Sequence, residues 1–145
     1  MRQILAIVLF ISGLFFFWPH SDPSHEERIR DSIQDAAEAT RRGLAGDFMD
    51  EIAMEFTDPS FSRKSLHGML LREFLGSGGS AVHLSDISVQ LAPSQTNATA
   101  TVTAEFPGSF FEARLESATV EFHLDYTLED DEWRIRAQQN QPTQR

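Results

Sequence analysis

Hydrophobic positions recur with helical spacing in the first half of the chain and with strand spacing in the second half. Ser24-x-x-Glu27 matches the capping box that starts many helices, in which the two side chains satisfy free backbone N–H groups. An apolar stripe with spacings of three and four follows it, and this stripe predicts a helix that ends at Gly43 or Gly46. The members of the stripe are Ile29, Ile33, Ala36, Ala37, Thr40 and Leu44.

Two shorter helices are predicted next along the chain. Asp47 can cap the second helix, and Asp58-Pro59-Ser60 would interrupt it. Its apolar stripe is Phe48, Ile52 and Phe56. The third helix begins near Ser62 or Ser65, and its apolar face is Leu66, Met69, Leu70 and Phe74. The Gly- and Ser-rich run at residues 76–80 then predicts a flexible loop.

From Val82 onward the apolar positions alternate with polar ones, which predicts β-strands. Four strands are expected, at residues 82–91, 98–106, 111–126 and 133–137. The phase of the alternation slips at Ser85-Asp86 and again near Glu116-Ser117, and such slips are typical of β-bulges. The polar residues from Gln138 to Arg145 are expected to form a frayed tail.

Helices followed by antiparallel strands predict an α+β fold. We expect three N-terminal helices packed on a curved four-stranded antiparallel sheet, preceded by an N-terminal apolar helix. The bulges would curl the sheet around the helices and form a cone. The expected organisation is a signal peptide or membrane anchor at residues 1–20, one domain at 21–139 and a disordered tail at 140–145.

The apolar segment Ile4–Trp18 follows Arg2 at the start of the chain. A basic residue before an apolar stretch is typical of a secretory signal peptide. A small-x-small cleavage pattern is missing after Trp18, which favours an uncleaved anchor, although a cleaved signal stays open. A helix from Met1 to Trp18 would reach about 27 Å, close to the ~30 Å hydrocarbon core of a bilayer. The domain is expected on the periplasmic side of the inner membrane if anchored, and in the periplasm or secreted if cleaved.

Composition narrows the classes of partner and of chemistry. The formal net charge is −10, and an acidic surface repels phosphate backbones, so no nucleic-acid binding is expected. The chain has no cysteine, which excludes disulfides, thiol nucleophiles and cysteine metal sites. The five histidines show no metal-binding spacing, and the acidic turn at residues 129–132 lacks the ligand pattern of a calcium loop. We therefore expect no metal and no cofactor.

Three segments carry a resemblance to a known superfamily. They are the helix Glu27–Leu44, the segment Gly46–Phe56 and the ending Glu129–Ile135, where an acidic turn precedes Trp, Arg and an aliphatic residue. Over residues 25–139 the chain resembles the NTF2-like (SnoaL-like) superfamily. The segments Phe61–Leu75, Val82–Leu91 and Ala98–Phe106 also resemble small bacterial envelope proteins of this superfamily whose function is unassigned. The resemblance implies a cone-shaped α+β fold. It says little about function, because this fold carries isomerases, dehydratases, cyclases and non-catalytic modules.

The enzymatic members of this superfamily suggest three catalytic candidates. The isomerase type needs a general-base Asp with a Tyr and a protonated Asp as oxyanion donors, and Tyr126 is the one tyrosine. By the alternation, Tyr126 points to the same side of its strand as the apolar residues, which indicates a core or rim position. The dehydratase type needs a His–Asp pair, and His123 and Asp125 point to one side of a strand. They lie on the phase opposite the apolar residues, so a solvated polar face is the expected interpretation.

Trp133, Arg134 and Arg136 are the candidate ligand-binding residues. Arg134 and Arg136 are expected to face outward and to pair with Glu121 or Asp125 on the neighbouring strand. If the curl of the sheet turned them inward, they would form an anion-binding pocket.

The expected function is a non-catalytic binding or interaction domain of the bacterial cell envelope, exported or tethered to the membrane through Ile4–Trp18. The alternative is a small-molecule isomerase or dehydratase that uses the cone pocket, so enzymatic activity stays an open question. A homodimer through the outer sheet face is a further expectation. It would bury Thr99, Thr101 and Thr103.

Overall fold

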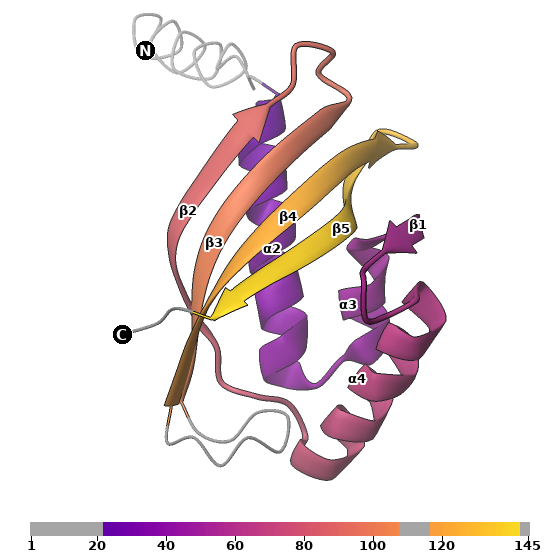
Figure 1. Cartoon of the computed structure of the whole chain (residues 1–145), viewed down its shortest axis with the longest axis vertical. Helices are drawn as coiled ribbons and strands as arrows, with labels where there is room; N and C mark the ends of the chain where they lie inside the picture. Colours follow the sequence, from indigo (N-terminus) through magenta and orange to yellow (C-terminus); the bar gives the residue numbers. More distant parts are fainter. Residues whose placement is uncertain (1–21, 108–116, 143–145) are drawn as a thin grey trace, which may run out of the picture.

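The computed structural model describes residues 22–107 and 117–142. Helix α2 (His25–Arg42) lies across one face of a curved sheet, and helices α3 (Ala45–Asp50) and α4 (Arg63–Ser77) lie at the end of the sheet that carries strand β1 (Figure 1). The predicted α+β arrangement of helices packed on a mostly antiparallel sheet is confirmed.

Helix α2 starts and ends where the sequence predicts. The Ser24 side chain accepts a hydrogen bond from the Glu27 backbone N–H, and the Glu27 carboxylate accepts one from the Ser24 N–H at 2.7 Å, which completes the capping box. The helix stops at Gly43, whose φ of 68° is in the left-handed region that glycine adopts without strain. Its apolar face, with Ile29 and Ile33 buried, covers the sheet.

The second predicted helix is only half right. Helix α3 ends at Asp50, and β1 (Ile52–Thr57) is a strand that pairs in parallel with β5 (Glu132–Pro142). Spacing could not separate the two outcomes, because Phe48, Ile52 and Phe56 fit a helical stripe while Ile52 and Phe56 also share one side of a strand. Pairing decides the outcome, since the Ile135 N–H donates to the Glu51 carbonyl at 2.8 Å and docks the segment at the sheet edge.

The sheet therefore has five strands where four were predicted. Its order is β1-β5-β4-β3-β2, with β2 at His83–Leu91, β3 at Asn97–Pro107 and β4 at Ser117–Glu129. The bulge predicted at Ser85-Asp86 is present as a register shift between Ser85 and Ser88. The bulge predicted near Glu116 lies outside the described residues. Strand β5 continues to Pro142, so a frayed tail from Gln138 was wrong for those residues, whose backbone pairs with β4.

A second bulge, in β5, was not predicted. Tyr126 pairs with Ile135 while Asp125 pairs with Ala137, so Arg136 is an extra residue on β5. The alternation predicted that Ala137 would follow Trp133 and Ile135 onto the inner face. The extra residue shifts by one position the β5 side chains that point toward α2. Gln138, rather than Ala137, therefore lies on the inner face of the sheet.

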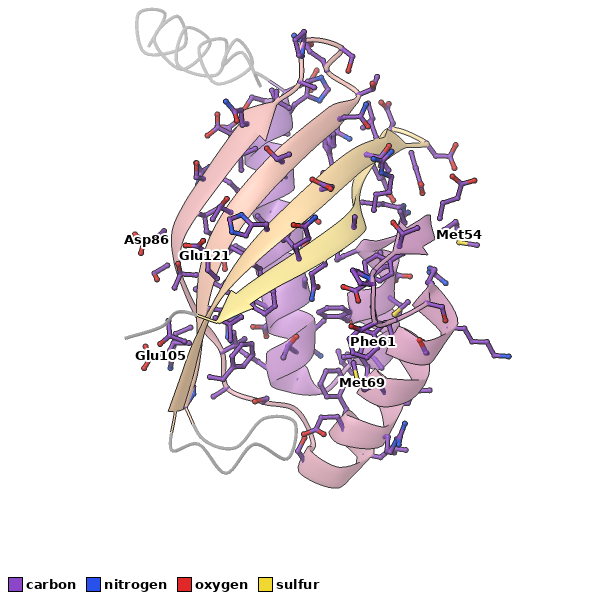
Figure 2. The ribbon with its side chains drawn as sticks, viewed as in Figure 1. Met54, Phe61, Met69, Asp86, Glu105 and Glu121 are labelled. Atoms are coloured by element: carbon purple, nitrogen blue, oxygen red, sulfur yellow. The ribbon has the colours of Figure 1, made fainter. Side chains whose placement is uncertain are left out.

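The core lies between α2 and the inner face of the sheet. Tyr126, Ile29 and Ile52 are its largest fully buried side chains. Polar and charged residues occupy the outer sheet face, where Glu121 lies, while Met54 points outward from β1 and is 73% exposed (Figure 2). None of the helices within residues 22–107 and 117–142 is long and apolar enough to cross a membrane. The apolar segment Ile4–Trp18 lies outside the described residues.

Candidate functional site

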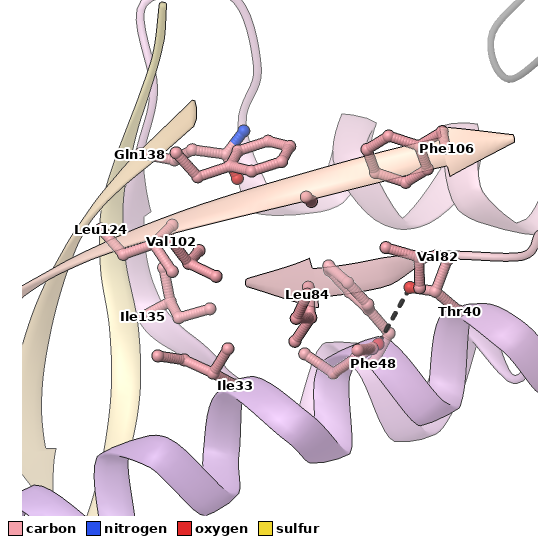
Figure 3. Close-up of a pocket in the computed structure, with 14 residues that line it drawn as sticks. Ile33, Thr40, Phe48, Val82, Leu84, Val102, Phe106, Leu124, Ile135 and Gln138 are labelled. Atoms are coloured by element: carbon pink, nitrogen blue, oxygen red, sulfur yellow. Dashed lines mark hydrogen bonds between the residues drawn. The ribbon is translucent and has the colours of Figure 1, made fainter. Parts of the chain in front are cut away.

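A small cavity lies inside the cone, between α2 and the inner face of the sheet (Figure 3). Its volume is about 100 Å³. Its walls are aliphatic and aromatic side chains from α2, from α3, from strands β2 to β5 and from the residue just before β2, namely Ile33, Ala36, Ala37, Phe48, Val82, Leu84, Val102, Ala104, Phe106, Phe122, Leu124 and Ile135. The rest of the cone is filled by the core, so a large substrate does not fit inside it.

Two polar side chains, Thr40 and Gln138, complete the lining of the cavity. The Thr40 hydroxyl donates to the Ala36 carbonyl of its own helix at 2.9 Å, so its donor is used locally (Figure 3). Gln138 comes from β5 on the sheet side of the cavity, opposite α2. Among the described residues that line the cavity, none is titratable.

The predicted catalytic candidates do not meet in this cavity. His123 and Asp125 lie on the sheet face turned away from α2, as their strand phase predicts. His123 is 39% exposed; its Nε2 lies 3.0 Å from a Glu121 carboxylate oxygen and its Nδ1 lies 3.3 Å from the Thr101 hydroxyl. These contacts are cross-strand and same-face contacts on a solvated surface. They do not form an acid–base pair at a pocket.

Tyr126 is a core residue with 1% of its surface exposed. Its hydroxyl lies near two polar side chains, Ser32 and Glu51, that do not line the cone cavity. That hydroxyl lies 3.5 Å from the Ser32 Oγ, and Ser32 donates to the Glu51 carboxylate at 2.5 Å. The three residues come from β4, α2 and the turn between α3 and β1. Ser32 and Glu51 line a cleft of about 450 Å³ whose other walls are Arg28, Asp31, Asp35, Asp50, Glu132, Trp133 and Arg134.

Burial raises the pKa of two groups in this network, the Glu51 carboxyl and the Tyr126 phenol. Burial raises the pKa of the Glu51 carboxyl because it disfavours the charged form, and the Asp35 carboxylate raises it further. The hydrogen bond from Ser32 and the charge of Arg134 act in the opposite direction. Burial also raises the pKa of Tyr126, so the phenol stays neutral across the physiological range. Burial therefore favours the protonated form of Glu51 more than it is favoured in an exposed carboxyl.

The predicted ligand-binding residues have structural partners. Trp133 is buried, and its indole Nε1–H donates to His25 Nδ1 at 3.2 Å, with the two rings edge to face. Arg134 donates to the Asp50 carbonyl and pairs with Glu132, so the partners predicted on β4 were wrong for Arg134. Arg136 is exposed at the bulge. Neither arginine lines the cone cavity, and the anion pocket considered from the sequence is not formed there.

Sequence reasoning missed Gln138 and Glu51 as site residues. Gln138 falls in a polar run that resembles a tail, and only the β5 bulge turns it inward. Glu51 follows Asp50 within the predicted second helix and off its apolar stripe, where a solvated carboxylate is expected. No group of three or more His, Asp or Glu side chains in the described part of the chain has a geometry that could hold a metal ion.

Comparisons with known proteins identify the fold. No family model matches the sequence, and no curated protein matches it at the level of sequence. The structure is similar to an NTF2-like protein of unknown function from Pseudomonas putida, with a TM-score of 0.62 and 14% identity over 79% of this chain and 84% of that one. It is also similar to a candidate scytalone dehydratase from Novosphingobium aromaticivorans, with a TM-score of 0.64 and 16% identity over 81% and 83% of the two chains.

A third neighbour is larger than this chain. Bd1075 of Bdellovibrio bacteriovorus matches with a TM-score of 0.69 and 11% identity over 81% of this chain, which spans only 40% of Bd1075. Similarity at these identities concerns the fold alone. The helices, the curved sheet and these neighbours agree that the chain has the NTF2-like fold.

Proposed function

We propose that this chain is a non-catalytic binding domain of the bacterial cell envelope whose cone cavity takes up a small apolar ligand. The observation that carries this proposal is the lining of the cavity, which is apolar apart from Thr40 and Gln138 and holds no titratable side chain among the described residues. General acid–base catalysis needs such a group within hydrogen-bond reach of the reacting atoms. The described lining of the cavity can bury an apolar ligand but offers no side chain for general acid–base catalysis.

The volume of the cavity limits the size of the ligand. Pockets for drug-sized molecules measure roughly 300–1,000 Å³, whereas an apolar cavity of roughly 150 Å³ holds benzene. A cavity of about 100 Å³ is smaller than that but is not closed, so it suits a short aliphatic group or one end of a small ring that extends out of it. Burial of such a group is favourable by roughly 25 cal/mol per Å² of apolar area, so weak binding is expected.

The test is equilibrium binding of toluene to the full chain by isothermal titration calorimetry. Ala37→Leu places an isobutyl group at the cavity wall and should weaken the binding of toluene at least tenfold. Ala92→Leu, in the loop between β2 and β3 and away from the cavity, is the matched control and should bind as the parent does. Undetectable binding to the parent, or equal binding to Ala37→Leu, would reject the cone cavity as the site.

The envelope location rests on the sequence of Ile4–Trp18 and on the preceding Arg2. The expected outcome in a Gram-negative host is that the full chain sediments with membranes and that protease added to the periplasm digests the domain. A chain that lacks residues 1–20 should instead remain in the cytosolic fraction. Equal fractionation of the two chains would count against the tether.

A second candidate function is favoured by one observation, the half-buried Glu51 carboxyl in its own cleft. A half-buried carboxyl with a raised pKa is a candidate proton donor or acceptor, the kind of group that isomerases and dehydratases require. In this alternative the reaction would take place outside the cone, where Ser32 and Glu51 meet. Turnover of a small carbonyl or hydroxy compound that is lost in Glu51→Gln and retained in His123→Ala would establish it.

A further inference from the structure

The cleft that contains Glu51 differs from the cone cavity in size and in chemistry. Its volume is about 450 Å³, and it lies where α2, the turn between α3 and β1, and the first residues of β5 meet. It shares no lining residue with the cone cavity. Seven of its nine lining residues are ionisable, and they include both acids and arginines. This Glu51 cleft is therefore suited to a charged ligand, whereas the cone cavity is suited to an apolar one.

Arg28 supplies a positive charge to the cleft. It is half-buried on α2, and its guanidinium forms no ion pair with any residue in the described part of the chain. The other arginine of the cleft, Arg134, is already paired with Glu132. A guanidinium presents parallel N–H groups that match the two oxygens of a carboxylate. Arg28 can therefore receive the carboxylate of a ligand.

Glu51 supplies a negative charge within the interior of the same cleft. Ser32 donates to one of its carboxylate oxygens at 2.5 Å, and a carboxylate has a second oxygen that can accept. Burial and the nearby Asp35 carboxylate both disfavour the charged form of Glu51, which raises its pKa. An ammonium group bound at Glu51 would oppose both effects, because it replaces lost solvent and offsets the repulsion from Asp35.

From this arrangement we infer that the Glu51 cleft binds a small zwitterion, with its ammonium group at Glu51 and its carboxylate at Arg28. The inference concerns a site separate from the cone cavity and requires no turnover, so it goes beyond the proposed function. Arg28 and Ser32 are four residues apart on α2, which is about 6 Å along the helix axis. A linear amino acid whose two charges are separated by about one helical turn spans these positions.

Three probes with five-carbon chains separate the contributions of the two charges. 5-Aminovalerate carries both charges, pentylamine carries only the ammonium group, and pentanoate carries only the carboxylate. An NMR titration of the full chain at neutral pH gives the affinity and shows which amide signals move. We expect 5-aminovalerate to bind roughly five- to tenfold more tightly than either single-charge probe, because it adds one charge-assisted contact. The signals of Ser32, Glu51 and Trp133 should respond to it.

Two substitutions test the two ends of the ligand. Arg28→Gln should reduce the affinity for 5-aminovalerate to that for pentylamine, and it should leave the affinity for pentylamine unchanged or higher. Glu51→Gln should reduce the affinity for 5-aminovalerate to that for pentanoate, and it should also weaken the binding of pentylamine. Arg136→Gln and Glu55→Gln are the matched controls, because both residues are exposed and neither lines the cleft. These controls should bind all three probes as the parent does.

Thermal unfolding verifies that each variant is folded. If Glu51→Gln alters the fold, Asp35→Asn tests the same end of the ligand and should weaken 5-aminovalerate at least twofold. Undetectable binding of 5-aminovalerate, or equal binding of 5-aminovalerate and pentylamine, would overturn the inference. A preference for 5-aminovalerate that survives Arg28→Gln would also overturn it. Binding of toluene in the cone is a separate measurement, so either proposal can fail while the other stands.

Discussion

Gly79 packs directly against Gly43, so that a Cβ atom added to Gly79 would lie 2.7 Å from the Gly43 backbone nitrogen. Gly43 ends α2 and Gly79 follows the end of α4, and both have positive φ, of 68° and 115°. The Ser80 N–H donates to the Thr40 carbonyl at 3.0 Å beside this contact. The ends of the two long helices are thus joined through backbone atoms, where the sequence predicted a flexible loop.

Gly79→Ala should destabilise the protein by roughly 2 kcal/mol or more, because it adds a clash with fixed backbone atoms to a backbone conformation unfavourable for alanine. Gly68→Ala is the matched control, since Gly68 lies within α4 with no neighbouring atom near the added carbon. That control should gain roughly 0.5–1 kcal/mol from helix propensity. Urea unfolding measures both changes, and equal effects at the two glycines would contradict the close contact.

His25→Phe should cost roughly 1–3 kcal/mol, because the buried Trp133 indole N–H would lose its acceptor. Chemical denaturation followed by tryptophan fluorescence measures the change, in a Trp18→Phe background that leaves Trp133 as the reporter. His83→Phe, at an exposed position at the start of β2, is the control. A cost at His83 as large as that at His25 would show that the Trp133 contact is not the source.

Glu51→Gln should remove a pH-dependent cost of folding. Burial raises the folded-state pKa of Glu51, so the folded protein binds this proton more tightly than the unfolded chain does. The parent therefore loses stability as pH rises from the ordinary value near 4.5 through the raised pKa, and the loss is complete above it. The amide introduced by the substitution does not titrate, and it keeps an oxygen that accepts from Ser32.

The free energy of unfolding, measured by urea denaturation at several pH values, is the readout for this prediction. The advantage of Glu51→Gln over the parent should grow with pH across that window and then level off. Glu55→Gln, at an exposed position of β1, is the matched substitution. An advantage that shrinks as pH rises would reverse the sign and refute the assignment.

The double substitution His123→Ala, Asp125→Asn should leave binding of toluene in the cone unchanged, because neither side chain lines the cavity. Its effect on stability should stay within about 1 kcal/mol, because both residues are partly exposed on the sheet surface and the contacts of His123 are to partly solvated side chains. Calorimetric titration checks the first expectation and thermal unfolding the second. Loss of binding in a folded variant would place the pair at the site after all.

Much of this fold could be predicted from short-range features of the sequence. The Ser24–Glu27 capping box and Gly43 define α2 because caps act within a few residues of a helix end. The slip at Ser85-Asp86 located the β2 bulge, since alternation must break where an extra residue enters. The outward placement of His123 and Asp125 and the burial of Tyr126 followed from strand phase alone.

Tertiary pairing decided what these local patterns leave open. The residues from Ile52 to Thr57 fit a helix or a strand equally well, and only the free edge of β5 selects the strand. Gln138 is inward because of one extra residue at Arg136, and Glu51 is half-buried because β1 docks beside Ile135. Each site thus depends on backbone hydrogen bonds between distant segments, whereas the periodicity of the sequence reports only which neighbouring side chains share a face.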